Sequence, residues 1–211
     1  MRGAARVLGW LAVAGVVVYV GVDVLLRFLR PSYSLLYNAE SDYGRGPWYW
    51  VMDINFLLRC ALSLAVIAAL KRSPGHSAAR LGDGGRVGLA LIAIWAVGSG
   101  LLAFFADNPA GTPVTASGLI HLVLGFIALF AAAAGTLLVS ASLRSDPSWR
   151  PDANLLLVLS VAGAAAFLLL AAASGHKHLP SGLCERIFLG IELLWLALAG
   201  WYAATRPHRL G

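Results

Sequence analysis

Charged side chains are scarce in this chain. Only 12% of its 211 residues are Asp, Glu, Lys or Arg, whereas 59% are hydrophobic, and the mean hydropathy is +0.77. A soluble domain carries about a quarter charged residues, so the shortage excludes an ordinary water-soluble protein. The composition is that of a membrane protein.

Cysteine is nearly absent as well, with Cys60 and Cys184 as the only two. They lie at different depths of two apolar runs, so we expect their Cα atoms to exceed the ~7 Å limit for a disulfide. Neither a CxxC pair nor the spacing of a zinc site occurs. We therefore expect two free thiols that pack as small apolar groups.

Acidic residues are fewer than basic ones, 10 against 16. A basic chain can bind nucleic acid, but no basic stripe with interleaved aromatic residues is present, so no nucleic-acid partner is predicted. The basic residues lie instead in short loops between apolar segments. The nearest partners for them are the anionic head groups of membrane lipids.

Six apolar runs are each close to the ~20 residues that a helix needs to cross a ~30 Å hydrocarbon core. The first run is too long for the apolar region of a signal peptide and is expected to be retained. The predicted fold class is all-α, an integral membrane six-helix bundle that forms one transmembrane domain over residues 1–211. The predicted spans are 5–29, 49–70, 87–106, 118–143, 155–173 and 184–203.

The distribution of basic residues predicts the orientation. Of the 16 Lys and Arg residues, ten lie at the two termini and in loops 71–86 and 144–150, and five lie on the opposite side. The positive-inside rule then places both termini in the cytoplasm. The predicted location is the cell (plasma) membrane, crossed several times.

Ionisable residues interrupt the apolar runs. Such side chains are costly in hydrocarbon, so by default they face the protein interior or a wet cavity and indicate a functional site. With the predicted orientation, all of them fall in the outer half of the membrane. They are Asp23, Asp53, Arg59, His121, Glu185 and Glu192.

Two of these residues lie deep in the membrane. At 1.5 Å per residue, Arg59 lies ~15 Å and Glu192 ~12 Å below the outer ends of their helices. An unpaired buried Arg is very costly, so we predict that these two residues pair, directly or through water. The pair could simply lock two helices together, or it could act as a switch in proton-coupled transport.

A short loop, 107–113, joins two of the predicted spans and carries Asp107, with His121 one helical turn beyond it. Ser117 is the predicted N-cap of the second span. A carboxylate beside an imidazole fixes its tautomer and suits it for acid–base or metal chemistry. The alternative is that Asp107 caps the loop and His121 bonds a backbone group.

These considerations define a candidate site. Its predicted catalytic residues are His121, Asp107 and Glu185, and its predicted substrate-binding residues are Ser41, Asp42, Asp53, Arg59 and Glu192. The segment His176-Lys177-His178 near Glu185 suggests a surface metal, but nothing else completes a coordination shell. No metal and no cofactor are predicted.

Three segments resemble a bacterial membrane family catalogued as domain of unknown function 998. The segment 32–44 resembles that family's first outside loop, 105–107 with 118–121 resembles its acidic loop and following histidine, and Glu185-Arg186-Ile187 resembles the start of its last span. The likeness covers about residues 5–205, although Ala106 stands where a proline is expected. It implies a six-helix bundle with no settled activity. A more distant likeness to eukaryotic six-span proteins, some involved in lipid-anchor remodelling, favours lipid handling.

Three functions stay open at this point. The first is the binding or modification of lipid head groups by the polar site, and the sequence does not decide whether the protein is an enzyme. The second is a non-enzymatic scaffold or accessory protein in which the charges only hold helices together. The third is a proton-coupled small-solute transporter, for which six helices would call for a homo-oligomer.

Overall fold

The computed structural model describes residues 2–73, 81–109, 111–174, 176 and 179–206. Within these residues the chain forms α-helices and one 3₁₀ helix and no strand, which confirms the all-α prediction. The elements are α1 (Arg2–Leu29), η1 (Glu40–Gly44), α2 (Tyr49–Arg72), α3 (Gly82–Leu102), α4 (Ala116–Ser145), α5 (Arg150–Ser174) and α6 (Ser181–Thr205).

All six α-helices are long and apolar enough to cross a membrane. Their bounds follow the predicted spans to within three residues except at α3 and at the start of α5, which begins at Arg150 and not at 155. The third span was expected over 87–106, but α3 begins at Gly82 and ends at Leu102. After Leu102 the chain turns out of the helix, and two of its carbonyl groups bond side chains of α4: Phe105 bonds the His121 ring and Ala106 accepts from the Ser117 hydroxyl.

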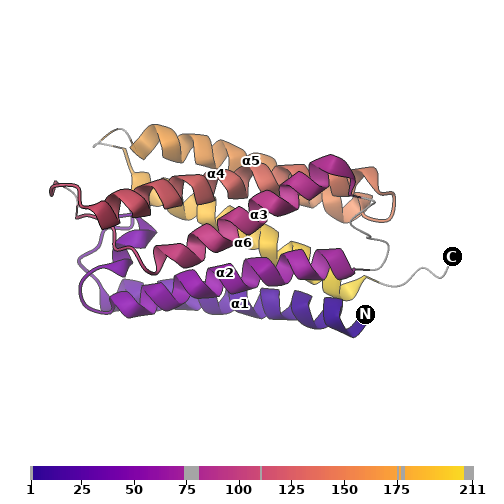
Figure 1. Cartoon of the computed structure of the whole chain (residues 1–211), viewed down its shortest axis with the longest axis horizontal. Coiled ribbons are helices and arrows are strands. Elements are labelled where there is room, and N and C mark those ends of the chain that lie inside the picture. The colour runs from indigo at the N-terminus through magenta and orange to yellow at the C-terminus, as the bar shows by residue number, and fades with distance from the viewer. Residues whose placement is uncertain (1, 74–80, 110, 175, 177–178, 207–211) are drawn as a thin grey trace.

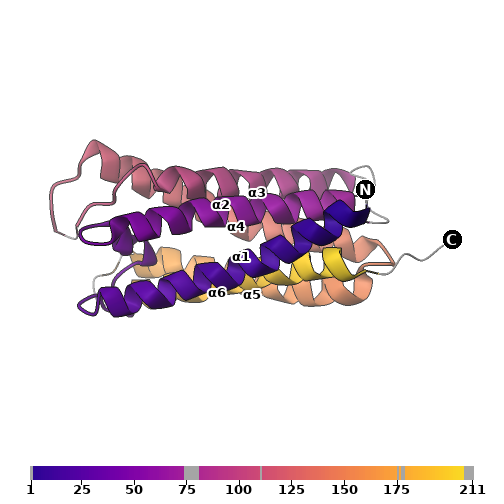
Figure 2. The same cartoon turned by 90° about the horizontal axis from the view of Figure 1, so that it is seen from below.

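The helices form a closed bundle, seen from two sides in Figures 1 and 2. Each helix packs on its neighbour in sequence, α1 closes the ring against α6, and α2 also packs on α6. α1 begins and α6 ends at one end, which we call the terminal end. η1 and the connections α1–α2, α3–α4 and α5–α6 lie at the other, the η1 end. The cytoplasmic location of the terminal end stays a prediction.

Small residues let the helices approach closely, while large apolar residues cover the outside. A Cβ added at Gly88 of α3 would lie 2.9 Å from the carbonyl oxygen of Gly135 of α4, and the reverse substitution meets the same distance. This contact suits helix packing in lipid, where small residues bring backbones together. Val17 and Leu168 are examples of the exposed apolar side chains on the outer faces.

The connection between α1 and α2 folds back over the start of α6. Arg186 donates from Nη1 to the carbonyl oxygens of Asn38 at 2.6 Å and Gly182 at 3.1 Å. The amide of Leu183 donates to the carbonyl of Leu36 at 3.1 Å. Gly182 touches the backbone of Asn38 so closely that a Cβ there would lie 2.2 Å from its carbonyl oxygen. These contacts hold η1 over the interior of the bundle.

Candidate functional site

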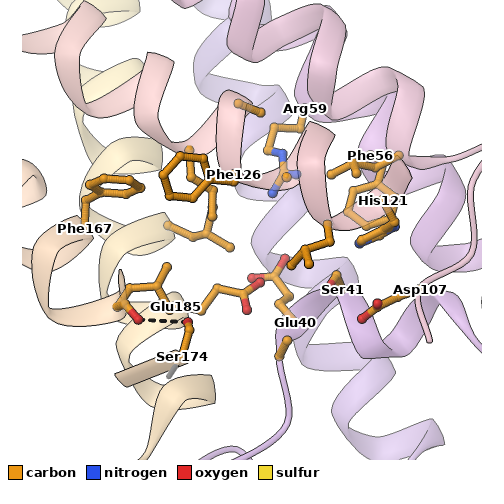
Figure 3. A pocket seen from close by; sticks show the side chains of 18 of the residues that line it. Glu40, Ser41, Phe56, Arg59, Asp107, His121, Phe126, Phe167, Ser174 and Glu185 are labelled. Carbon is orange, nitrogen blue, oxygen red and sulfur yellow. Dashed lines mark hydrogen bonds between the residues drawn. The ribbon is translucent and has the colours of Figure 1, made fainter. Parts of the chain in front are cut away.

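A cavity of about 310 Å³ lies beneath η1 and is lined from α2, α4, α5 and α6. Its size falls in the range of small-ligand sites, ~300–1,000 Å³. Figure 3 shows polar side chains at one wall and aromatic rings at another. The polar residues that line it are Glu40, Ser41, Arg59, Asp107, His121, Ser174 and Glu185.

A second cavity of about 180 Å³ adjoins the first. Ser41, Asp107 and His121 line both, and Asp53 lines only the second. The structure therefore brings six of the predicted site residues to the two cavities: these four together with Arg59 and Glu185. The roles assigned to them stay predictions.

Arg59 of α2 is buried, with 3% of its surface exposed. Its Nε donates to the Ser99 hydroxyl at 3.0 Å and its Nη1 donates to the Tyr19 hydroxyl at 3.0 Å. The rings of Tyr19, Phe56 and Trp95 lie 5.3–5.7 Å from the guanidinium carbon, so the cation is also stabilised by their π faces. Arg59 makes no ion pair with Glu192, and the predicted direct pair is wrong.

The side chain of Glu192 does not point toward Arg59. Its carboxyl is 1% exposed, and neither oxygen has a hydrogen-bond partner among the described residues. A Cβ added at Gly163 of α5 would lie 2.4 Å from its Oε1, so the carboxyl faces α5. Arg59 faces α1 and α3 instead. Equal depth along two helices did not predict a contact because it does not fix the direction of a side chain around the helix axis.

Glu40 is a site residue that the sequence did not predict. It is 4% exposed, lines the larger cavity, and accepts a short hydrogen bond from the Tyr19 hydroxyl. Burial and the nearby Asp23 carboxylate raise its pKa to about 6, and the Arg59 charge and the Tyr19 hydrogen bond oppose that rise. The polar loop around it resembles a solvated segment. In the structure this loop is packed, and the rings of Tyr33 and Tyr43 stack 5.5 Å apart.

Asp23 of α1 lies close enough to Glu40 to affect its pKa, but it does not line the cavity. It is partly buried, and its Oδ1 has no hydrogen-bond partner in the described part of the chain. Its charge raises the pKa of both Glu40 and Tyr43. Asp23 therefore adds negative charge beneath η1.

His121 is held by a backbone group. Its Nδ1 lies 2.7 Å from the Phe105 carbonyl oxygen, and its ring meets the Phe56 ring edge-on at 6.2 Å. A carbonyl accepts only, so Nδ1 is the donor, and Nε2 of the neutral ring is the acceptor. Asp107 does not bond His121. It accepts from the Asn108 amide at 2.7 Å, as the alternative interpretation of the two residues expected.

The start of α4 differs from the prediction. Ser117 was the expected N-cap, but Thr115 takes that position and its Oγ1 accepts from the Gly118 amide at 3.1 Å. The Asn108 side chain accepts in turn from the Thr115 amide at 3.2 Å. Ser117 lies inside the first turn, and its hydroxyl donates to the Ala106 carbonyl at 3.0 Å.

Asp42 lies outside both cavities. Its carboxylate pairs with Arg45 at 2.5 Å and accepts from the Asn38 side-chain amide at 2.9 Å. These contacts are local to the connection between α1 and α2. The predicted substrate-binding role of Asp42 therefore has no support from its position, and its side chain stabilises η1 instead.

Glu185 of α6 projects into the larger cavity. It makes no hydrogen bond or ion pair with any residue that the structure describes. Its carboxyl and that of Glu40 point toward each other, and the Arg59 guanidinium lies above them in this view (Figure 3). The lining thus contains three carboxyl groups, those of Glu40, Asp107 and Glu185, and one guanidinium, that of Arg59.

Cys60 and Cys184 are both free, as their different depths predicted. Of the segment considered as a metal site, only His176 is described, while Lys177 and His178 lie outside the described residues. Among the residues that the structure describes, no three His, Cys, Asp or Glu side chains gather as metal ligands.

Six apolar helices with ionisable side chains buried between them define a multi-pass membrane protein. The chain belongs to the family described as Protein of unknown function (DUF998), whose model matches residues 13–202. The resemblance seen in the sequence is thereby confirmed. No curated protein and no solved structure matches the chain.

Proposed function

We propose that this protein binds the head group of a membrane lipid in the cavity beneath η1. One observation carries the proposal: the cavity extends from a polar wall to the exposed apolar surface of α4. Leu122 and Phe126 both line the cavity, yet they are 65% and 59% exposed. An amphiphile would place its acyl chain along these residues and its head group beside Glu185 and Arg59.

The charges favour a head group that carries an ammonium. The lining holds three carboxyl groups and one guanidinium, and two of the Arg59 nitrogens already donate to Ser99 and Tyr19. Glu185 accepts no hydrogen bond from a residue that the structure describes, so an ammonium would supply the hydrogen bonds that it lacks. In this proposal Glu185 acts as the ammonium acceptor.

Modification of the head group is the finer form of this proposal. His121 would serve as general base through Nε2, since its Nδ1 is fixed by the Phe105 carbonyl. Asp107, although it lines the same cavity, does not support the imidazole. Binding is therefore the function that the geometry supports best.

A variant whose new side chain fills the cavity tests the proposal. Gly125 lines the cavity, and a Cβ there meets no atom within 4 Å, so Gly125→Leu adds bulk to the cavity without a backbone clash. Gly190 of α6 is exposed, lies outside the lining and has the same free space. Gly190→Leu is therefore the matched control.

Lipid retained by the protein purified in detergent is measured by native mass spectrometry. We expect Gly125→Leu to lower the affinity about tenfold, equivalent to ~1.4 kcal/mol, while Gly190→Leu keeps wild-type occupancy. Equal occupancy in all three proteins would rule out the cavity as the lipid site. It would favour the accessory-protein function, in which the charges only hold helices together.

A further inference from the structure

The carboxyl of Glu192 is isolated in the middle of the bundle. It is 1% exposed and has no hydrogen-bond partner among the described residues. Removing an ionised carboxylate from water costs several kcal/mol unless a charge or hydrogen bonds compensate. The Thr136 hydroxyl of α4 lies near the Glu192 carboxyl, but its own proton is donated to the Ala132 carbonyl at 3.0 Å.

None of the elements packed against α6 supplies a counter-ion. On α5 the nearest group is Gly163, which has no side chain. On α2 the guanidinium of Arg59 is committed to Ser99 and Tyr19. Apart from the uncharged thiol of Cys60 in the middle of α2, the other ionisable residues described on these elements lie toward helix ends or beneath η1. They are Arg6, Tyr19, Asp23 and Arg27 of α1, Glu40, Asp42 and Tyr43 of η1, Tyr49, Asp53, Lys71 and Arg72 of α2, His121 and Arg144 of α4, and Arg150 and Asp152 of α5.

Glu192 also shares a helix face with the cavity. Glu185 and Glu192 are seven residues apart on α6, which places them on one face and about 10 Å apart along the axis. Leu189 lies between them, is buried, and forms part of the cavity lining. The apolar side chain of Leu189 therefore lies between the buried carboxyl of Glu192 and the cavity carboxyl of Glu185.

We propose that Glu192 is a proton-binding site, which holds a proton in the closed bundle and exchanges it with Glu185 in the cavity past Leu189. The step moves one proton from a carboxyl oxygen of Glu192 to the carboxylate of Glu185. It leaves Glu192 ionised and involves no redox change. The site does not depend on lipid binding, and it gives the molecule the protonatable group that a proton-coupled process requires.

Infrared spectroscopy of the full chain in lipid bilayers tests the bound proton. At neutral pH the wild-type protein should show the carbonyl stretching band of a protonated carboxyl. Glu192→Gln should lose this band, and Glu185→Gln should keep it. A wild-type spectrum without the band, or one that Glu192→Gln leaves unchanged, would overturn the proposal.

The exchange path is tested in D₂O with the same band. Leu189→Ala opens the apolar gap, so the band should shift to its deuterated position at least tenfold faster than in the wild type. An unchanged exchange rate would contradict the path past Leu189.

A second variant covers the case in which Glu192→Gln does not fold. In Gly163→Ala the new Cβ would lie 2.4 Å from Oε1 of Glu192 and must displace the carboxyl. The band should therefore change frequency in Gly163→Ala and stay fixed in Gly190→Ala, where a Cβ meets no atom within 4 Å. An unmoved band in Gly163→Ala would assign it to another carboxyl and refute the site.

Discussion

Arg59 is a buried cation that is linked to the Glu40 carboxyl through the phenol of Tyr19. The Tyr19 hydroxyl accepts from Arg59 and donates to Glu40, so the opposite charges are connected without direct contact. From the sequence, Arg59 could be recognised as a costly buried charge, but the residues that it hydrogen bonds could not be identified. Tyr19 stands in an apolar run, where a tyrosine resembles any packing residue, and Glu40 stands in a polar loop.

The raised pKa of Glu40 predicts a pH effect on stability. Its folded pKa of about 6 lies above its ordinary value of 4.5, so the unfolded chain loses this proton first. Stability from the neutral carboxyl is full below about pH 4.5 and is lost as the pH rises through about 6. Glu40→Gln lacks this contribution.

Thermal unfolding in detergent between pH 4 and pH 8 measures the effect. The wild-type unfolding temperature minus that of Glu40→Gln should fall as the pH rises and level off above the folded pKa. Because other carboxyl groups titrate in both proteins, only this difference is informative. A difference that is flat or rises with pH would contradict the assignment.

At the scale of elements, run length and hydropathy were enough to find the six helices, because a span must be long and apolar whatever face it presents. They did not reveal which way a side chain points around its helix, and so the predicted contact between Arg59 and Glu192 was wrong. They also missed the end of α3 at Leu102. The residues that follow are apolar like the helix, but two of their carbonyl groups bond side chains of α4, a contact that run length does not reveal.

The contact between the α1–α2 connection and α6 can be tested at Gly182. An added Cβ would lie 2.2 Å from the Asn38 carbonyl oxygen, so Gly182→Ala must push this connection away from α6. Gly190→Ala on the same helix meets no atom within 4 Å and is the control.

We expect Gly182→Ala to destabilise the protein by roughly 1–3 kcal/mol, as overpacking typically does. Amide hydrogen exchange across η1 should accelerate in the same variant. Exchange as slow in Gly182→Ala as in Gly190→Ala would show that the connection does not depend on this contact.

On the scale of the whole molecule, the ionisable residues within the spans lie in the half of the bundle nearer the η1 end, while both termini lie at the other end. The sequence predicted this asymmetry, because helix direction and residue number fix depth in the membrane. The cavity was not predictable, since it depends on how the connection between α1 and α2 folds back over α6. For that reason Glu40 was missed, and Asp42, two residues later, does not line either of the two cavities.

Head-group selectivity tests the central claim most directly. Phosphatidylethanolamine and phosphatidylglycerol with matched acyl chains compete for the purified protein, and native mass spectrometry measures the bound fraction of each. The wild type should prefer the ammonium-bearing lipid by about tenfold, or ~1.4 kcal/mol. Glu185→Gln should lose most of that preference, because the Glu185 carboxylate, which accepts no hydrogen bond from a described residue, is the proposed ammonium acceptor. A wild type that binds neither lipid, or that prefers the anionic one, would contradict the account.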